Sequence, residues 1–272
     1  LLEMIISLAY LAKCNFNDVF SPVRMWDCIC YNHLRENNIV IPPKKHEKKS
    51  EAYEGAYVKE PQLGRHKWVC SFDLNSLYPH LIMQYNISPE TILGTWQDDI
   101  GVEGLLNKEF DTSIWKEKNI TVTPNGSVYR RDKQGFLPKL MESMYNDRVK
   151  YKKLLLAEQK KGRNADPNKL SQYYNYQQNL KIALNSAYGA MGNQWFRYYD
   201  ERNAEAVSVA GQLAVQWAEN AVNNYLNTTL SAGNKDYIVA MDTDSLYVCL
   251  DDLVTKVGLT DKNKIIDFLD KV

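Results

Sequence analysis

The sequence has few cysteines, and none stand at the spacings that bind zinc. Its five cysteines, at positions 14, 28, 30, 70 and 249, include no Cys-x-x-Cys pair and no cysteine–histidine cluster. An odd number of scattered cysteines argues against a secreted domain held together by disulfides. We therefore expect reduced thiols and a cytosolic protein.

Long apolar runs are also lacking. The opening segment 1–12 is apolar but short and carries Glu3, so it is neither a membrane span nor a signal peptide. Internal repeats and low-complexity tracts are absent, which excludes a repeat architecture. The chain does not begin with Met, and we expect it to be a piece of a longer protein.

The chain has no net charge, but its charges are unevenly distributed. Its 33 Lys and Arg residues balance 33 Asp and Glu residues. Residues 139–181 hold ten basic and four acidic residues, whereas residues 235–272 hold eight Asp and five Lys. A basic segment beside an acidic one is typical of a protein that meets polyanions and binds cations. With 272 residues, of which 44% are hydrophobic, the chain is globular and can form one large or two ordinary domains.

The sequence does contain a pair of aspartates between two apolar runs. In "AMDTDSLYV", Asp242 and Asp244 separate residues 237–241 from residues 246–250, and both runs are typical of β-strands. One interpretation is a hairpin turn with solvated carboxylates. The other is a cation site, because two carboxylates at a rigid turn repel each other unless a proton or metal neutralises them.

A third carboxylate favours the cation site. Residues 68–72 predict a buried strand that ends at Asp73, and residues 76–82 predict the start of a helix, with Pro79 in its first turn. If these strands are neighbours, three carboxylates would support two divalent ions ~3.5–4 Å apart, as in phosphoryl transfer. The backbone N–H groups of residues 74–78 would lie beside the ions and bind a triphosphate.

Two long helices are predicted at 138–161 and 168–191, with a break at 162–167 that makes them an antiparallel hairpin. A third helix is expected over 203–227. Its apolar stripe is suited to packing on a sheet and comprises positions 207, 210, 214, 217, 218, 221 and 225. Residues 42–51 predict an exposed loop, and residues 97–137 a turn-rich region with a hairpin at 124–126.

The helical hairpin carries a candidate phosphate site. Arg148 and Lys152 share one face of the first helix, and Lys181, Asn185 and Tyr188 share a stripe of the second. These faces could be ordinary solvated surfaces. Facing cations with Asn and Tyr below them instead favour a site for phosphates and a sugar or base. The same stripe carries Gly189 and Gly192, which predicts close packing there because glycine is costly in a helix.

Three segments in this order carry a family resemblance. "SFDLNSLYP" (71–79), "KIALNSAYG" (181–189) and "MDTDS" (241–245) resemble motifs A, B and C of the family-B DNA polymerases. The flanking "GAYVKEP", "NISPETI" and "GNQWFRYYD" resemble the members of the family found in T-even-like bacteriophages. The resemblance covers almost the whole chain.

The resemblance implies an α+β fold, with a palm whose antiparallel sheet bears the catalytic carboxylates and a two-helix antiparallel fingers hairpin. It implies addition of deoxynucleotides to a primer 3′ end with two Mg²⁺ ions, whose ligands would be Asp73, Asp242, Asp244 and the Leu74 carbonyl. Catalysis would involve Asp73, Asp242, Asp244 and Lys181. The nucleotide would be bound by Leu74, Ser76, Leu77, Tyr78, Arg148, Lys152, Lys181, Asn185, Tyr188 and Gly189.

The resemblance also implies domains and partners. The end of an N-terminal domain would occupy residues 1–44, the palm residues 45–134 and 194–272, and the fingers residues 135–193. The exonuclease and the thumb would be absent from this chain. Partners would be primer–template DNA, deoxynucleoside triphosphates, a thumb-bearing polypeptide and a sliding clamp, with no membrane and a location in the cytoplasm of a bacterial host.

The chain departs from the family pattern in two ways, and two alternatives stay open. The first departure is the absence of the family's acidic exonuclease motifs, its downstream Lys-rich motif and the thumb; the second lies beside the hairpin aspartates. Ala240 and Met241 stand where the family often has Tyr-Gly, although the aspartates are intact. A non-catalytic DNA- or nucleotide-binding module is one alternative, but binding alone would not need Asp73, both hairpin aspartates and Lys181. An RNA-synthesising or reverse-transcribing palm enzyme is the other. The resemblance disfavours RNA synthesis because Tyr78 would lie under the sugar and clash with a 2′-hydroxyl.

Overall fold

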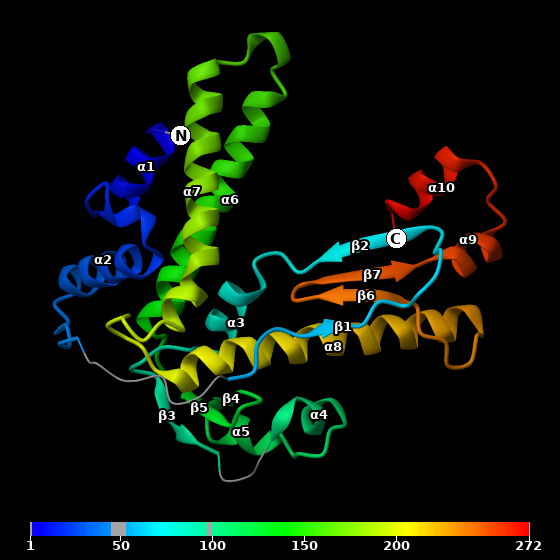
Figure 1. The fold of residues 1–272 in the computed structure, drawn as a ribbon, viewed down its shortest axis with the longest axis horizontal. Coiled ribbons are helices and arrows are strands. Elements are labelled where there is room, and N and C mark those ends of the chain that lie inside the picture. The colour runs from blue at the N-terminus through cyan, green and yellow to red at the C-terminus, as the bar shows by residue number, and fades with distance from the viewer. Residues whose placement is uncertain (1, 45–52, 97–99, 272) are drawn as a thin grey trace.

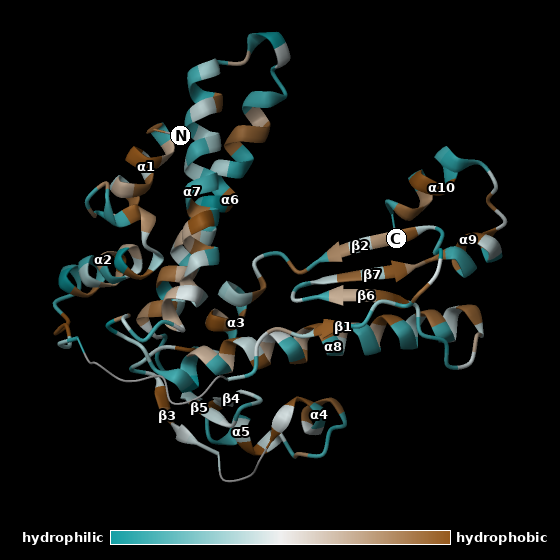
Figure 2. Ribbon diagram, in the orientation of Figure 1, coloured by the Kyte–Doolittle hydropathy of each residue, from teal (hydrophilic) through white to brown (hydrophobic). Residues whose placement is uncertain are grey.

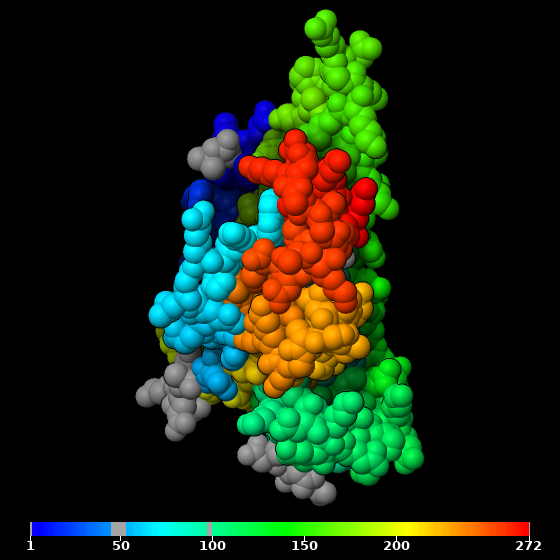
Figure 3. Space-filling model, turned by 90° about the vertical axis from the view of Figure 1, so that its right-hand side faces the viewer, coloured from blue at the N-terminus to red at the C-terminus, as the bar shows by residue number. Residues whose placement is uncertain are grey.

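The chain folds into an α+β structure in which two antiparallel sheets lie on opposite sides of one long helix (Figure 1). The computed structural model describes residues 2–44, 53–96 and 100–271. A pair of long helices projects from the sheets, and its tip stands clear of the rest of the molecule in the space-filling view (Figure 3). The expected fold class, with its antiparallel sheet and two-helix hairpin, is confirmed.

The main sheet has the strand order β1-β6-β7-β2, and all neighbours are antiparallel. Its strands are β1 (Val58–Lys59), β2 (Val69–Asp73), β6 (Ile238–Asp242) and β7 (Ser245–Cys249). The two strands expected around the aspartate turn are confirmed to within one residue. Asp73 pairs with Ser245 across β2 and β7, so the two aspartate-bearing segments meet at one end of the sheet.

Strand β2 differs from the expected buried strand. Val69 is 40% exposed and Phe72 is 44% exposed. The strand lies at the edge of the sheet, with β7 as its one neighbour, and a short apolar run does not by itself reveal such a position. The expectation of burial is therefore wrong, whereas the strand end at Asp73 is confirmed.

Helix α8 (Glu201–Leu230) packs beneath the main sheet (Figure 1). Val215 and Leu226 join the apolar core between helix and sheet. The expected sheet-facing stripe is wrong in part, because Trp217 is 65% exposed and Tyr225 is 68% exposed. The first half of the helix is enclosed by several elements and only the second half lies under the sheet, so one stripe cannot describe both halves.

The projecting hairpin consists of α6 (Phe136–Gln159) and α7 (Pro167–Met191), joined through the short helix η2 (Gly162–Asn164). Both helices agree with expectation to within two residues. Asp166 caps α7 because its carboxylate accepts a hydrogen bond of 2.9 Å from the backbone N–H of Asn168. The tip is hydrophilic and the base is apolar (Figure 2), so burial of the base fixes the hairpin on the body of the molecule.

Helices α1 (Leu2–Ala12) and α2 (Pro22–Glu36), with η1 (Asp18–Phe20) between them, pack against α7. The indole N–H of Trp26, fully buried, donates a 3.0 Å hydrogen bond to the Ala183 carbonyl. These helices therefore brace the side of the hairpin. Among the described residues, no helix combines the length and apolarity needed to cross a membrane.

A second sheet lies on the other side of α8, with the strand order β3-β5-β4. Its strands are β3 (Ile92–Thr95), β4 (Ile120–Val122) and β5 (Ser127–Arg130), and the turn expected at 124–126 joins the last two. Two short helices, α4 (Gly101–Leu106) and α5 (Ser113–Glu117), occupy the region that we expected to consist of turns. Their short patterns lack the periodicity from which a helix is predicted.

The remaining helices lie at the ends of the main sheet. Helix α3 (Leu77–Tyr85) follows β2 with Pro79 in its first turn, as expected, and α9 (Asp251–Val257) and α10 (Lys262–Leu269) follow β7. The loop expected at 42–51 lies largely outside the described residues. The division of the chain into four domain segments stays a prediction.

Candidate active site

One polar pocket of about 420 Å³ lies where the end of the main sheet, the start of α3 and the lower parts of α6 and α7 meet. Carboxylates come from the sheet, and cationic side chains come from the helical hairpin. The residues that line it are Asp73, Asn75, Ser76, Leu77, Tyr78, Pro79, Arg148, Lys181, Asn185, Thr243 and Asp244. The pocket thus joins segments far apart in the sequence.

A tight turn between β6 and β7 places Asp244 in this pocket. Thr243 adopts a left-handed conformation with φ of 53°, which is unfavourable for a β-branched residue. Its N–H donates a 3.0 Å hydrogen bond to the Tyr57 carbonyl, which holds the turn. The carbonyl of Asp244 accepts a 2.7 Å hydrogen bond from the N–H of Leu74, so the turn is tied directly to the segment after Asp73.

The electrostatics of Asp244 favour a cation. Burial, and then the nearby carboxylate of Asp73, raise the pKa of Asp244 above its ordinary value of 3.8, with a smaller contribution from Asp242. A metal ion would relieve this repulsion, and carboxylate oxygens are ligands that Mg²⁺ accepts. No group of three His, Cys, Asp or Glu side chains in the described part of the chain is arranged to hold a metal ion. The pocket contains two carboxylates, and Asp242 does not line it.

Arg148 links the helical hairpin to the turn before α3. Its guanidinium donates a 2.8 Å hydrogen bond to the hydroxyl of Ser76, a residue in the left-handed conformation with φ of 55°. The Nε–H of Arg148 is buried and has no hydrogen-bond partner among the described residues. Buried donors without a partner are uncommon and point to a missing acceptor, and an anion in the pocket would provide one.

Tyr78 forms an aromatic wall of the pocket. Its ring lies 4.7 Å from the ring of Tyr188, centroid to centroid, at an interplanar angle of 62°. On the other side it approaches Gly211 of α8, where an added Cβ would lie 2.8 Å from the ring. Burial raises the pKa of the Tyr78 hydroxyl to about 12. The ring is thus held in one place by a neighbouring ring and a glycine.

The family of the chain follows from a match over most of its sequence. Residues 24–272 match the family described as DNA polymerase family B. The chain belongs to this family. The expected resemblance is therefore confirmed, and the sheet with its aspartates and the α6–α7 hairpin fits the palm-and-fingers description of family B.

Two phage polymerases are similar over nearly the whole chain. The chain is 35% identical to the DNA-directed DNA polymerase of Escherichia phage RB69 and 34% identical to that of Enterobacteria phage T4. Each match covers 99% of this chain and 35% of the relative, so the chain spans about a third of their length. The DNA polymerase 1 of Pyrococcus abyssi is 31% identical over 79% of this chain and 24% of its own.

A solved structure shares the fold. The family-B DNA polymerase of Pyrobaculum calidifontis superposes with a TM-score of 0.62 at 24% identity, and the match covers 94% of this chain and 31% of that chain. The arrangement of sheet, long helix and helical hairpin is therefore a family-B fold.

Most of the predicted site residues meet in the pocket. Those that line it are Asp73, Ser76, Leu77, Tyr78, Arg148, Lys181, Asn185 and Asp244, and those that do not are Leu74, Lys152, Tyr188, Gly189 and Asp242. Tyr188 contacts the pocket indirectly through Tyr78. The Leu74 N–H, which we expected to be free for a triphosphate, is instead bonded to Asp244.

Two residues of the pocket were not predicted from the sequence. Asn75 and Thr243 line the pocket, and both stand inside the motifs that drew attention to their neighbours. Close packing is confirmed at Gly192, where a Cβ would collide with the Tyr53 hydroxyl. It is wrong at Gly189, where the added Cβ would have no described atom within 4 Å apart from its chain neighbours and the nearby backbone of its own helix, and the glycine that meets the Tyr78 ring is Gly211.

Proposed function

We propose that the chain is the catalytic part of a DNA-directed DNA polymerase that adds deoxynucleotides to a primer 3′ end under the direction of a template. The observation that carries this proposal is the pocket in which Asp73 and Asp244 face Arg148 and Lys181. Carboxylates on one side and cations on the other suit a reaction in which a phosphate is held between metal and protein. The family and the phage relatives give the class of reaction.

The carboxylates would hold divalent metal. Asp73 and Asp244 would be the main ligands, and Asp242 and the Leu74 carbonyl would complete the set for two Mg²⁺ ions. Bound ions of this kind lower the pKa of an attacking hydroxyl and neutralise a leaving pyrophosphate. The raised pKa of Asp244 supports this assignment, because its causes are burial and then the negative charge of Asp73, and a bound cation would offset both.

The helical hairpin would bind the triphosphate. Lys181 and Arg148 would bind phosphate oxygens, and Asn185 would lie beside them. Lys152, one turn above Arg148 on α6, would meet the nucleotide only if the hairpin tilts toward the sheet, since it does not line the pocket. The unpartnered Nε–H of Arg148 supports an anion as the missing acceptor.

The turn before α3 would position the sugar and the primer end. Ser76 and Leu77 would contact the triphosphate, and the ring of Tyr78 would lie under the deoxyribose. Tyr188 supports that ring, and the open space above Gly189 would receive the new base pair. The hydroxyl of the primer would then attack the α-phosphate, and pyrophosphate would leave.

The remainder of a longer protein would supply duplex DNA binding. The phage relatives are about three times longer than this chain, and a thumb-bearing polypeptide and a sliding clamp are the partners we propose. In this proposal the chain acts in the cytoplasm of a bacterial host.

Primer extension tests the proposal. The chain alone, and then the chain with a C-terminal thumb polypeptide, is incubated with primer–template DNA, deoxynucleotides and Mg²⁺. We expect short extension by the chain alone and longer extension with the thumb, because affinity for DNA grows with the number of phosphate contacts. No extension in either case, with nucleotide binding retained, would instead make the chain a non-catalytic nucleotide-binding module.

A further inference from the structure

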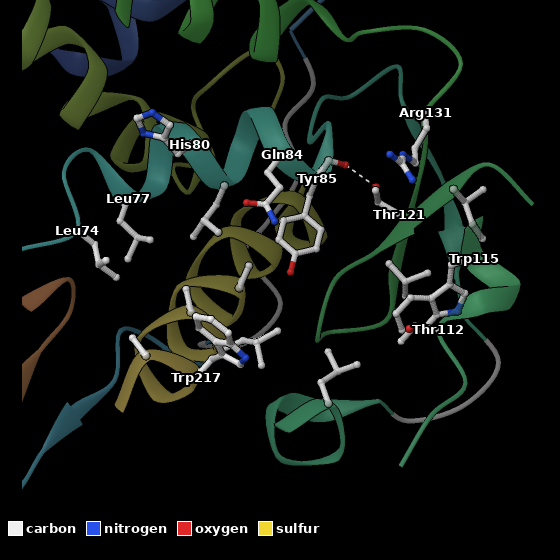
Figure 4. A pocket seen from close by; sticks show the side chains of 18 of the residues that line it. Leu74, Leu77, His80, Gln84, Tyr85, Thr112, Trp115, Thr121, Arg131 and Trp217 are labelled. Carbon is white, nitrogen blue, oxygen red and sulfur yellow. Dashed lines mark hydrogen bonds between the residues drawn. The ribbon is translucent and has the colours of Figure 1, made fainter. Parts of the chain in front are cut away.

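A second and larger cavity, of about 710 Å³, lies behind α3, on the side away from the polar pocket. Its walls come from α3, from α8 and from the segment that holds α5 and β4 (Figure 4). Cavities of this size, roughly 300–1,000 Å³, are typical of small-molecule sites. The proposed polymerase reaction makes no use of this cavity.

Three aromatic rings line the cavity. Figure 4 shows the side chains of Tyr85 from α3, Trp115 from α5 and Trp217 from α8 around one space. Trp217 is 65% exposed and lies on the less buried second half of α8. Large aromatic side chains around a concave surface bind flat apolar ligands well, because each buries a large area with little loss of conformational freedom.

The charge of the rim is positive. Lys116 and Arg131 line the cavity, and no acidic residue is among the described residues that do so. The neighbouring Arg130 is ion-paired with Asp132, whereas neither Lys116 nor Arg131 has an ion pair within the described part of the chain. The rim therefore has two uncompensated cations beside an aromatic floor, which is complementary to an aromatic anion.

The cavity shares a wall with the polar pocket. Leu77, at the first position of α3, lines both. Leu74 lines the cavity with its side chain, while its N–H donates the 2.7 Å hydrogen bond to the Asp244 carbonyl. A ligand that moves these two leucines would thus move the turn that carries Ser76 and the backbone beside Asp244.

We propose that this cavity is a binding site for a small aromatic anion, and that its occupancy is coupled to nucleotide binding through Leu74 and Leu77. The rings of Tyr85, Trp115 and Trp217 hold the aromatic part, and Lys116 and Arg131 hold the anionic group. The coupling, but not the binding, rests on the proposed nucleotide site. By linkage, nucleotide and anion change each other's affinity by the same factor.

The fluorescent aromatic anion anilinonaphthalene sulfonate is a suitable probe, titrated into the folded chain. We expect saturable binding to one site. Trp217→Ala should weaken it about tenfold, which equals about 1.4 kcal/mol, because a large aromatic contact is lost. Arg131→Gln should weaken it about threefold, because exposed charge pairs are screened.

Two matched variants control for non-specific binding. Tyr225→Ala removes an equally exposed aromatic ring from the same helix, and Lys133→Gln removes a nearby cation, but neither residue lines the cavity. Both should leave the affinity for the probe unchanged. Equal loss in Trp217→Ala and Tyr225→Ala, or no loss in either, would overturn the site.

The coupling is tested by repeating the titration with saturating deoxynucleotide and Mg²⁺. We expect the dissociation constant of the probe to change about fivefold or more, within the usual range of coupling between sites. An unchanged constant, with nucleotide binding verified by calorimetry, would overturn the coupling. If calorimetry shows no nucleotide binding, the proposed polymerase function fails, while the probe titration still reports on the cavity.

Discussion

Gly211 of α8 lies against the Cε1 edge of the Tyr78 ring, and the replacement Gly211→Ala tests this packing. The added Cβ would lie 2.8 Å from Cε1 of Tyr78, 3.6 Å from its Cδ1 and 3.8 Å from Cδ1 of Leu81. The first distance is too short for two carbon atoms, which prefer about 3.5–4.0 Å. The ring must therefore move by about 0.7 Å or more, away from α8 and into the polar pocket.

The cost of this movement can be isolated with a second glycine. Gly189 lies within α7, where an added Cβ meets no described atom within 4 Å apart from its chain neighbours and the nearby backbone of its own helix. Both replacements by Ala gain the same helix propensity, roughly 1 kcal/mol, and Gly211→Ala also suffers overpacking, typically about 1–3 kcal/mol. The free energies of unfolding of the two variants should therefore differ by about 1–3 kcal/mol, with Gly189→Ala more stable than the wild type.

Thermal unfolding followed by circular dichroism measures this difference. For a chain of this size we expect the midpoints of the two variants to lie about 2–10 °C apart. In a form of the protein that extends primers, Gly211→Ala should also raise the KM for deoxynucleotides, because the displaced ring narrows their site. Unfolding midpoints that lie within about 1 °C of each other would refute the argument that Gly211 packs against Tyr78.

Three further predictions concern the pocket. Lys181→Ala should raise the KM for deoxynucleotides about tenfold or more, the cost of one hydrogen bond to a charged group, without a matching loss of affinity for primer–template in a binding assay. Tyr78→Ala should raise the ratio of ribonucleotide to deoxynucleotide efficiency at least about tenfold, and an unchanged ratio would remove Tyr78 from sugar selection. Asp244 holds its proton more tightly in the folded state than in the unfolded state. Its contribution to the free energy of unfolding is therefore fully present below its ordinary pKa of 3.8 and is lost as the pH rises through the folded-state pKa. In metal-free buffer Asp244→Asn should therefore gain stability over the wild type between acidic and neutral pH in urea unfolding, and a difference independent of pH would contradict the assignment.

The long helices and the aspartate hairpin could be predicted from the sequence because their signals are local. The break at 162–167 separates two long helical patterns, and the structure ends α6 and begins α7 within two residues of the expected bounds. The sequence also predicts that Asp73 meets the aspartate hairpin if their strands are neighbours, and the pairing of β2 with β7 meets that condition. Periodicity and strand ends thus give the elements and the side chains that they bring together.

Properties that depend on packing could not be predicted in this way. The exposure of β2 follows from its place at the sheet edge, and the bond from the Leu74 N–H to Asp244 follows from the approach of two distant turns. The role of Gly211 depends on a ring from another helix. None of these contacts leaves a pattern within its own segment, so only the three-dimensional structure shows them.

The replacement Asp244→Asn tests most directly whether the carboxylates of the pocket transfer nucleotides. Asn keeps the shape of the side chain but removes the charge that would bind metal. The measurement is single-turnover addition of one templated deoxynucleotide, in the presence of Mg²⁺, by a form of the protein that extends primers. The wild type should add the nucleotide and the variant should not, while the variant keeps the wild-type fold and affinity for DNA. Nucleotide addition by the variant at the wild-type rate would contradict the proposed role of Asp244 and, with it, the assignment of this pocket as the active site.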